Sequence, residues 1–596
     1  MTDPWGIEPG YFDVDGGWHD TPPDTIRRLR VAMGGLADVD DPPPASRPVW
    51  FVRQGTGPEM LRPAEIRLED GFVMHVGRAL PPDLPLGYHD LLPDDGGPTT
   101  RLIVVPDRCP QPPARAAGLA VQLYAARSTE SWGIGDLEDL RTVGRWAAGR
   151  GAPFVMTSPL HAPTPAGPQE ASPYFASTRR WHNPLHIRPD VGAIATEARS
   201  LNGEHLLDRD RVWGHKEEAL LAEWSLVRER VPSLAHAAFL AEGGALLESW
   251  GRFCALAERF GADWRSWPTD LRRPDGPAVE RACAAPDVAD RAAFHTWLQF
   301  RFDQQHDDVA AEVPLIHDLA VGASPGGFDA WVWQDVLAPG VRVGAPPDEF
   351  NRAGQDWGLP PFIPWKLRAH GYEPLAELLR AGFRHAAGLR IDHVMGLFRL
   401  YWVPAGAGPA EGGYVRYPGQ ELLDIVALES VRAGAFVVGE DLGTVEDSVR
   451  DALMARGVLS YRLAWFEDRA PELWPVEAVA AVTTHDLPTL AGAWSGSDDD
   501  GGEFGGRIAG LTGLEPDAPL DEVAPALHER VAAAPCRLAL ATLDDAMGAI
   551  ERPNVPGTTT ERPNWSIGLP IPVDELDGCA LAGAVVDALT SHERGS

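Results

Sequence analysis

The sequence has few cysteines, and none of them is arranged as a ligand set. Five cysteines lie far apart, and no two have the Cys-x-x-Cys spacing of a metal site. An odd number of scattered cysteines also argues against a disulfide framework. The five are Cys109, Cys254, Cys283, Cys536 and Cys579. We therefore expect neither a metal site nor a fold that depends on disulfides.

Basic residues are also scarce. The 596 residues include 52 Lys and Arg against 86 Asp and Glu, which gives a formal net charge of −34. Because phosphates and anionic membranes attract Lys and Arg, this balance argues against a nucleic-acid partner and against adsorption to a membrane. A neutral ligand, such as a sugar, is compatible with it.

Long hydrophobic runs are missing as well. There is no run of about 18 apolar residues that could span a bilayer. Residues 1–10 lack the basic start and apolar stretch of a signal peptide. We therefore predict a cytoplasmic protein with no membrane partner. The sequence leaves the oligomeric state open.

Tyrosine is rare, with 9 residues, whereas tryptophan is frequent, with 21. Tryptophan has the largest flat apolar side chain, and most tryptophans fill protein cores. Trp132, Trp357, Trp494 and Trp565, however, lie in loops rich in glycine, proline and polar residues. There the ring face could stack on the C–H face of a pyranose, so core packing and sugar binding both stay open for these four.

The chain is too long for one ordinary domain. Its first hundred residues contain short extended stretches separated by Pro, Gly and Asp clusters, which is typical of a small β-rich module. These stretches are 48–52, 66–68, 72–76 and 100–105. We therefore predict an amino-terminal accessory module over 1–112 and a catalytic domain over 113–596.

After residue 113, short apolar runs alternate with helical patterns. Strand followed by loop, helix and strand is the order of a parallel α/β fold, and eight such units close a (β/α)8 TIM barrel. The predicted strands are 119–124, 154–157, 315–322, 388–394, 436–439, 461–466 and 479–484. A stretch rich in Ala, Leu, Glu and Arg breaks the alternation, and we predict a helical insertion at about 200–310.

Three acidic residues follow predicted strands directly. Asp392, Glu440 and Asp486 each end a largely apolar run, and in a parallel barrel the reactive residues lie at the carboxyl ends of strands. Retaining glycosidases use two such carboxyl groups, one as nucleophile and one as general acid/base. Arg390 precedes Asp392 by two residues, so both side chains should face the same side and the arginine should keep Asp392 ionised. Taken singly, each acid could equally cap a helix or pair with a neighbour.

Several segments resemble a known family. The motifs LRIDHVMG at 389–396, GEDLG at 439–443 and THDLPT at 484–489 are similar to signature segments of the amylomaltases, the 4-α-glucanotransferases of glycoside hydrolase family 77 in the α-amylase superfamily. The resemblance continues in SWGIGD at 131–136, SPY at 172–174, GAPPD at 344–348, GQDWG at 354–358, NVPGT at 554–558 and PNW at 563–565. These segments stand in the family's order.

The resemblance implies a role for each matching residue. Asp392 would be the nucleophile, Glu440 the general acid/base and Asp486 the group that stabilises the transition state. Arg390 and His485 would frame the subsite of the cleaved glucose. The other substrate-binding residues implied are Ser172, Tyr174, Asp318, Asp348, Gln355, Trp357, Asn564 and Trp565. The family needs no cofactor or metal.

The resemblance also implies transfer as the reaction. The partners would be α-1,4-glucans and maltooligosaccharides, with glucose as an acceptor. A retaining mechanism forms the same intermediate when water is the acceptor, so a hydrolase of maltooligosaccharides is one alternative. A non-catalytic glucan-binding protein is another, although the presence of all three acids argues against it.

Overall fold

The computed structural model describes residues 2–13, 16–37, 41–113, 115–190, 195–347, 352–443, 445–498, 503–558 and 560–592. The chain divides into two compact units. The first consists of Met1–Gln111, Trp333–Arg384 and Ile391–Ser460, and the second of Pro112–Val332, His385–Arg390 and Tyr461–Ser596. The first change of unit, after Gln111, lies one residue before the predicted boundary, and the first unit also takes in two later segments.

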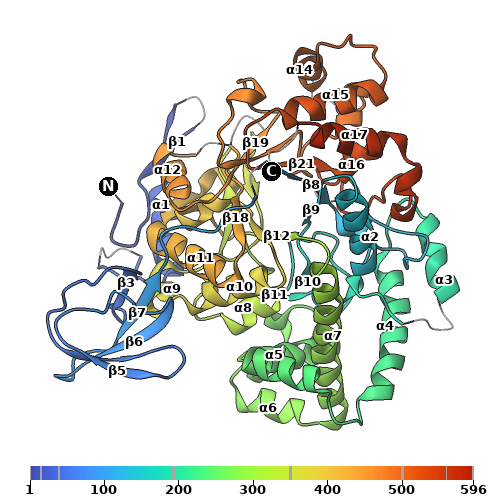
Figure 1. Ribbon diagram of the computed structural model, residues 1–596. Coiled ribbons are helices and arrows are strands. Elements are labelled where there is room, and N and C mark those ends of the chain that lie inside the picture. Colours follow the sequence, from blue (N-terminus) through green and yellow to red (C-terminus); the bar gives the residue numbers. More distant parts are fainter. Residues whose placement is uncertain are drawn as a thin grey trace. The chain divides into compact units, whose positions relative to one another are not determined.

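The largest sheet has eight strands (Figure 1). They are β8 (Ala116–Val121), β9 (Phe154–Thr157), β12 (Leu315–Leu319), β15 (Gly388–Ile391), β18 (Phe436–Gly439), β19 (Ser460–Leu463), β20 (Ala478–Ala481) and β21 (Leu538–Thr542). Their order in the sheet is β18-β15-β12-β9-β8-β21-β20-β19, which is the chain order read around a ring. A parallel bridge from Val438 to Leu459 joins the two ends of that order. This confirms the predicted (β/α)8 barrel.

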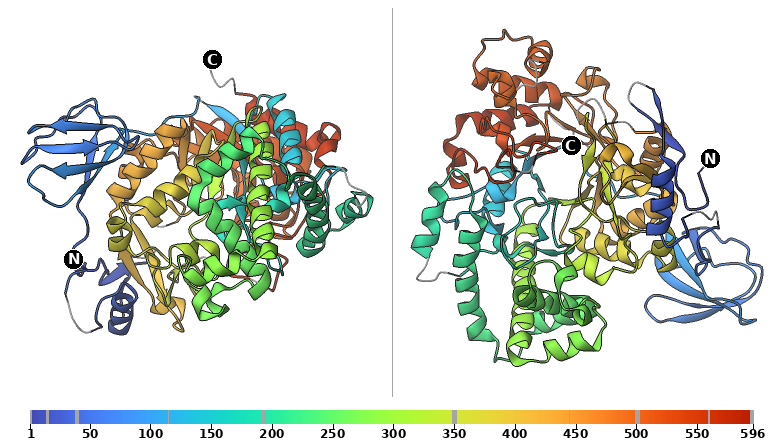
Figure 2. Two further views of the ribbon diagram at one scale, coloured as in Figure 1. Left: turned by 90° about the horizontal axis from the view of Figure 1, so that it is seen from below. Right: turned by 180° about the vertical axis from the view of Figure 1, so that it is seen from behind.

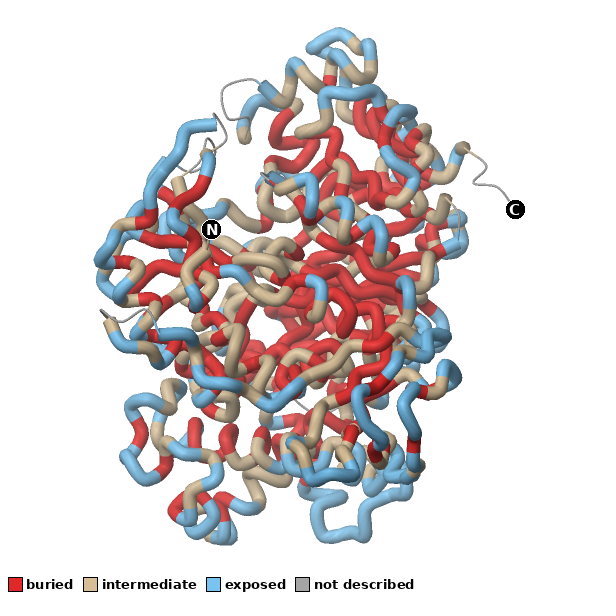
Figure 3. The backbone as a smooth tube through the Cα atoms, turned by 90° about the vertical axis from the view of Figure 1, so that its left-hand side faces the viewer, coloured by how far each residue is buried: buried red, intermediate tan, exposed pale blue. Residues whose placement is uncertain are grey.

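The barrel strands of the second unit are packed tightly against one another. Gly118 in β8 has no space for a side chain, because a Cβ there would lie 2.3 Å from the carbonyl oxygen of Phe154 in β9. Strand residues such as Leu119, Val155 and Leu538 are fully buried. Figure 3 draws the buried residues of the described chain in red. Leu119 and Val155 belong to the main hydrophobic core of this unit.

Helices follow most barrel strands. The helix after β8, α2 (Leu137–Ala148), begins with a capping box in which Asp136 and Asp139 each accept a hydrogen bond from the other's backbone amide. The other helices of this kind are α10 (Glu373–Phe383), α11 (Gly419–Ala433), α12 (Asp447–Ala455), α13 (Leu490–Ser495), α14 (Glu503–Thr512), α15 (Leu520–Ala532), α16 (Leu543–Ala546) and α17 (Ala580–Thr590).

The helical insertion lies between β11 (Thr178–His182) and β12. It contains α3 (Ala195–Ser200), α4 (Arg209–Val227), α5 (Leu234–Phe260), α6 (Pro277–Cys283) and α7 (Pro286–Ala310). The long helices α5 and α7 run side by side (Figure 1). A buried aromatic cluster that includes Phe253, Trp267 and Trp331 gives this part of the second unit its own core.

The first unit contains a five-stranded sheet, drawn in blue in Figure 2. Its order is β3-β7-β6-β4-β5, with β3 (Val49–Arg53), β4 (Ala64–Arg67), β5 (Val73–Val76), β6 (Gly87–Pro93) and β7 (Thr100–Val105). Glu69 joins this sheet to α10 and α11 through Arg380, at 3.1 Å, and Arg432. The β-rich character that the sequence predicts is present.

Three elements of the first unit were not predicted. They are the hairpin of β1 (Gly10–Phe12) and β2 (Trp18–Asp20), the helix α1 (Pro23–Ala32), and a four-stranded antiparallel sheet of order β14-β13-β16-β17. This sheet consists of β13 (Val341–Ala345), β14 (Gln355–Asp356), β16 (Arg399–Pro404) and β17 (Gly413–Arg416). Helix α9 (Pro364–Ala369) also belongs to the first unit, whereas α8 (Phe328–Val332) belongs to the second. Among the described residues, no helix is both long and apolar enough to cross a membrane.

Candidate active site

In the second unit, Arg390, Asp318 and Tyr174 form one hydrogen-bonded group. Arg390, in β15, donates from Nη1 to both carboxylate oxygens of Asp318, in β12, at 2.6 and 2.7 Å. The hydroxyl of Tyr174 donates to Asp318 Oδ2 at 2.6 Å. Arg390 and Asp318 are both buried. Strands β15 and β12 are neighbours in the sheet, which explains how residues 72 positions apart meet.

His485 and Asp486 follow β20 and form a second polar group of this unit. His485 Nε2 lies 3.4 Å from Asp486 Oδ2, and Asn554 Nδ2 donates to Asp486 Oδ1 at 2.6 Å. Burial raises the pKa of Asp486, but His485, Asn554 and Arg390 outweigh it, so this pKa lies below its ordinary value. Burial lowers the pKa of His485, but the carboxylates of Asp486 and Asp318 reverse that effect and raise it. Asp486 is therefore held ionised beside a histidine that readily becomes cationic.

Three rings pack together beside these groups. The ring centroids of Tyr174 and His485 lie 5.0 Å apart, and Trp565 lies 5.3 Å from Tyr174 and 5.2 Å from His485. Trp565 adopts a φ of 61°, which is unusual for a residue with a side chain. Arg209 donates to the Trp565 carbonyl and, at 3.2 Å, to the hydroxyl of Ser566, which holds this backbone in place. Such a wall of rings suits stacking against a sugar.

In the first unit, Glu440 is held by backbone amides on both sides. Glu440 Oε2 accepts the amide N–H of His393 at 3.0 Å, and Oε1 accepts that of Leu442 at 2.7 Å. The amide of Glu440 itself donates to the carbonyl of Ile391 at 3.0 Å. Asp392 stands between Ile391 and His393 and is half-buried. The structure thus fixes the ends of β15 and β18, and with them the two acids, to each other.

His393 and Trp357 complete this part of the first unit. His393 has a left-handed backbone, with φ of 49°, and its ring lies 5.2 Å from that of Trp357. Burial, reinforced by Arg399, lowers the pKa of His393 to about 4, so the ring is neutral at physiological pH. Trp357 Nε1 donates to Gln355 Oε1 at 3.0 Å. Asp348 lies outside the described residues.

Two other predicted site residues use their side chains locally in the second unit. The Asn564 side chain accepts the amide of Val555 at 3.2 Å and donates to the Thr558 hydroxyl at 2.8 Å. The Ser172 hydroxyl accepts the backbone amide of Tyr174 at 3.3 Å. These contacts shape the loops beside Trp565 and Tyr174.

The four tryptophans singled out in the sequence separate into two groups. Trp132 is 2% exposed and packs with alanines 195, 198 and 219, and Trp494 packs on the main core while donating to the Ala518 carbonyl. Core packing is therefore the correct interpretation for these two. Trp357 lies beside His393 and Gln355 in the first unit. Trp565 lies beside Tyr174 and His485 in the second unit and, at 7% exposed, is also part of the main core.

Sequence reasoning missed four polar residues near these groups in the second unit. Asn554 was seen only as part of a motif, although it contacts Asp486. Gln122, Thr157 and Asp544 line a cavity of about 30 Å³ together with Asp318, Arg390 and His485. The available signal was their position: Gln122 directly follows β8, Thr157 ends β9, and Asp544 follows β21 within two residues. Among the described residues, no group of three or more His, Cys, Asp or Glu could hold a metal ion.

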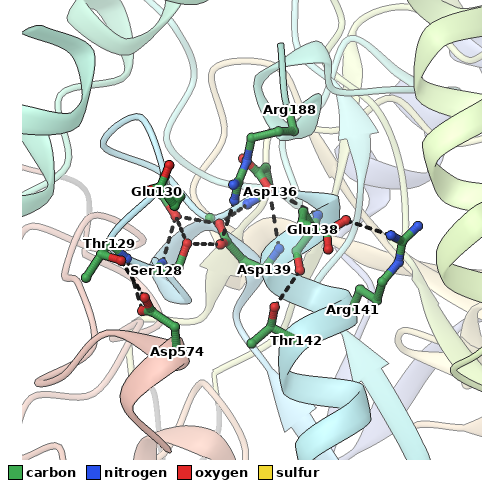
Figure 4. Close-up of polar contacts among 12 residues, drawn as sticks. Ser128, Thr129, Glu130, Asp136, Glu138, Asp139, Arg141, Thr142, Arg188 and Asp574 are labelled. Carbon is green, nitrogen blue, oxygen red and sulfur yellow. Dashed lines mark hydrogen bonds and ion pairs between the residues drawn. The ribbon is translucent and has the colours of Figure 1, made fainter. Parts of the chain in front are cut away.

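A different buried polar group of the second unit gathers around the start of α2 (Figure 4). We call Ser128, Ser131, Asp136, Asp139, Arg188 and Lys216 the loop cluster. Arg188 donates to Asp136 and, at 2.7 Å, to Asp139 Oδ1, and the Ser131 hydroxyl donates to Asp139 Oδ2 at 2.6 Å. Burial and the neighbouring Asp136 raise the pKa of Asp139, against the effect of Arg188.

Lys216 completes the loop cluster and is fully buried. Its Nζ donates to the carbonyls of Leu185 and Ile187 at 2.6 and 2.8 Å and lies 3.9 Å from Asp136 Oδ2. Burial lowers the pKa of Lys216 to about 8, although Asp136 opposes this. Each charge of the cluster therefore has a partner within the protein.

A parallel eight-stranded barrel with acidic and basic side chains at the ends of its strands defines a (β/α)8-barrel enzyme. The model of glycoside hydrolase family 77, described as 4-alpha-glucanotransferase, matches residues 121–572. The chain belongs to this family.

Relatives and solved structures agree with this assignment. The 4-alpha-glucanotransferase of Mycobacterium tuberculosis is 41% identical over 572 residues, covering 84% of this chain and 78% of that protein. The amylomaltase from Corynebacterium glutamicum has a TM-score of 0.85 at 30% identity and covers 98% of both chains. The amylomaltase from Streptococcus agalactiae, solved in complex with acarbose, has a TM-score of 0.66 at 17% identity, with coverage of 80% of this chain and 99% of that one, and shows likeness of fold alone.

Proposed function

We propose that this 4-alpha-glucanotransferase moves a segment of an α-1,4-glucan onto the 4-hydroxyl of glucose or of another maltooligosaccharide, with retention of configuration. The observation that carries the proposal is the family match over 121–572, which includes Asp392, Glu440 and Asp486. The domain assignment is part of the proposal: residues 113–596 perform catalysis and 1–112 are an accessory module. The match lies wholly within 113–596, which supports this division.

In the proposed mechanism, two acids act in two steps. The Asp392 carboxylate attacks the anomeric carbon while Glu440 protonates the departing glycosidic oxygen, which leaves a covalent glucosyl ester on Asp392. Glu440 then takes the proton of the acceptor's 4-hydroxyl. That oxygen attacks the anomeric carbon, forms the new glycosidic bond and releases Asp392.

Asp486 stabilises the transition state in this proposal. Positive charge develops on the sugar ring as the glycosidic bond breaks, and a carboxylate that stays ionised stabilises it. The lowered pKa of Asp486 supports the role. Its anchoring by Asn554 means that the carboxylate needs little reorganisation during the reaction.

The remaining site residues bind the glucan. Arg390, Asp318 and His485 contact the hydroxyls of the cleaved glucose, and Tyr174 and Trp565 supply ring faces. Gln355, Trp357 and Asp348 bind neighbouring glucose units. Asn564 and Ser172 act through the loops that they hold, which their hydrogen bonds to those loops support.

Incubation of the purified protein with maltotriose tests the reaction class. We expect glucose to appear together with a ladder of maltooligosaccharides longer than maltotriose. Maltose and glucose without longer products would mean that water is the acceptor, and the function would then be hydrolysis.

Glu440→Gln tests the acid/base role. Loss of the proton donor should abolish turnover of maltotriose but spare part of the first step with α-maltosyl fluoride, because fluoride leaves without protonation. Release of the first leaving group, fluoride from α-maltosyl fluoride and glucose from maltotriose, is compared in the variant and in the wild type. Equal loss on both donors would remove Glu440 from this role.

A further inference from the structure

The cavity of about 30 Å³ beside Asp318 and Arg390 is lined at the carboxyl ends of adjacent strands. In the sheet order β15-β12-β9-β8-β21-β20, these strands and the segments that follow them contribute, in turn, Arg390, Asp318, Thr157, Gln122, Asp544 and His485. The six side chains thus form one continuous polar arc. All of them belong to the second unit.

Several other polar side chains of the cavity wall are already used by the protein. The Ser158 hydroxyl accepts the amide of Leu123 at 3.3 Å, and the Thr542 hydroxyl accepts the amide of Asp545 at 3.1 Å. The hydroxyls of Thr483 and Thr489 donate to backbone carbonyls at 3.0 and 2.9 Å. These four side chains are structural.

Gln122, Thr157 and Asp544 differ from these four. Gln122 Oε1 and Thr157 Oγ1 are buried and have no hydrogen-bond partner within the described part of the chain. The Asp544 carboxyl group accepts a hydrogen bond from its own backbone amide, and no side chain among the described residues donates to it. The three residues are 8%, 2% and 8% exposed. Because buried polar groups in native proteins are nearly always hydrogen-bonded, three such groups around one cavity indicate a missing polar ligand.

We infer that Gln122, Thr157 and Asp544 form a polar floor that binds a hydroxyl-bearing group of the donor glucose. The inference rests on the proposed function, because it takes the glucose held by Arg390, Asp318 and His485 as the ligand. The Gln122 oxygen accepts a hydrogen bond, the Thr157 hydroxyl donates or accepts one, and the Asp544 carboxylate accepts one. Sugar hydroxyls can both donate and accept, so they satisfy all three.

The size and walls of the cavity agree with this ligand. A volume of about 30 Å³ exceeds the roughly 10–15 Å³ that one water needs, so a small polar group fits. Ala120, Val121 and Met156 supply apolar wall beside the polar groups. A site of this kind discriminates strongly against a donor without the matching hydroxyl, because the buried partners are then left unpaired.

The test combines variants of the floor with donors that lack single hydroxyls. Gln122→Met, Thr157→Val and Asp544→Asn keep the side-chain size while changing hydrogen bonding. Fluoride release is measured for α-glucosyl fluoride and for its 2-deoxy, 3-deoxy and 6-deoxy forms, with glucose as acceptor. Thr142→Val is the matched control, since the Thr142 hydroxyl donates to the Glu138 carbonyl within α2 and lies outside the cavity wall.

We expect each floor variant to lower kcat/KM for α-glucosyl fluoride by about 3-fold to 10-fold, the range of one hydrogen bond. With one of the deoxy donors the variant and the wild type should become equal, because the hydroxyl that the floor binds is gone. Thr142→Val should match the wild type on every donor.

Two results would overturn the inference. Floor variants that lose the same factor on all three deoxy donors would show that the floor holds only water, and variants without any loss would show no role in binding. In either case the wild type still disproportionates maltotriose, so the proposed function survives. A wild type inactive on maltotriose and on α-glucosyl fluoride would overturn both. Melting temperatures identify a variant that fails to fold. Thr157→Val alone or Gln122→Met alone is enough to decide whether the floor binds a donor hydroxyl.

Discussion

The second unit contains two buried polar clusters that differ in how far the protein satisfies them. In the loop cluster, Asp136 and Asp139 face Arg188 (Figure 4), and Lys216 donates to backbone carbonyls. In the arc of side chains at the strand ends, Arg390 and Asp318 are paired, whereas the Gln122 oxygen, the Thr157 hydroxyl and the Asp544 carboxyl group have no partner side chain among the residues that the structure describes.

This difference distinguishes a cluster that stabilises the fold from a cluster that can bind a ligand. A buried charge that is paired within the protein fixes a loop in one conformation, and removing one partner leaves the other buried and uncompensated. A buried polar group without a partner weakens the fold but is ready for a ligand. We therefore expect changes in the loop cluster to act on stability and changes at the strand ends to act on activity.

Asp392→Asn should give the largest effect on activity. Removal of the proposed nucleophile should lower kcat by roughly 10⁴-fold to 10⁶-fold, the range seen when a covalent nucleophile is lost. The melting temperature should stay close to that of the wild type. Disproportionation of maltotriose and thermal unfolding measure the two quantities. Near-normal turnover would exclude Asp392 as the nucleophile.

Arg188→Ala should give the largest effect on stability. It leaves Asp136 and Asp139 buried without their common cation, so the free energy of unfolding should fall by about 3–5 kcal/mol. Activity per folded molecule should change little. Denaturant unfolding measures the free energy of unfolding, and maltotriose turnover below the melting transition measures the activity. A variant that keeps the wild-type free energy of unfolding but loses activity would contradict the structural role of the loop cluster.

Asp544→Asn should stabilise the protein in a pH-dependent way. Burial raises the pKa of Asp544 to about 6 from an ordinary 3.8. The folded state therefore keeps this proton between about pH 4 and pH 6 while the unfolded state loses it, so stability falls as pH rises through this window.

Above about pH 7 the buried charge costs about 3 kcal/mol, which the asparagine avoids. The variant should therefore gain stability over the wild type at pH 8 and show almost no gain at pH 4, while kcat/KM falls. Unfolding curves at the two pH values measure the gain. The same gain at both pH values would mean that the pKa of Asp544 is not raised.

Arg211→Ala should have the smallest effect and serves as the control for Arg188→Ala. Arg211 pairs with Glu204 at 2.5 Å, but the side chains are 53% and 41% exposed. Water already solvates both charges, so the free energy of unfolding should fall by only about 0.2–1 kcal/mol. A loss as large as that of Arg188→Ala would show that burial does not distinguish the two pairs.

The sequence was sufficient to predict the barrel and most of its strands. Strands β15, β18 and β20 are short apolar runs that end in an acid or in a Thr-His-Asp segment, and a pattern of this kind can be seen locally. Strand β21 was missed because its sequence, LALAT at 538–542, is rich in residues that also favour helices. Only the neighbours β8 and β20 make this segment a strand.

The site was predictable to a similar degree. The positions of Asp392 and Glu440 after their strands could be read from the sequence. The expected action of Arg390 on Asp392, two residues away, stays a prediction, and the structure adds a contact of Arg390 with Asp318, 72 residues away, that spacing did not suggest. This contact depends on which strands are neighbours in the sheet, and spacing along the chain contains no such information.

The sequence by itself determined which residue types stand at the strand ends, because strand, turn and helix patterns are local and place those positions without the rest of the fold. The tertiary structure alone decided which of these polar groups find partners. Satisfaction of a hydrogen bond depends on the positions of atoms from distant segments. For this reason Ser158 and Thr542 are structural, whereas Thr157 and Asp544, one and two residues away from them, remain open to a ligand.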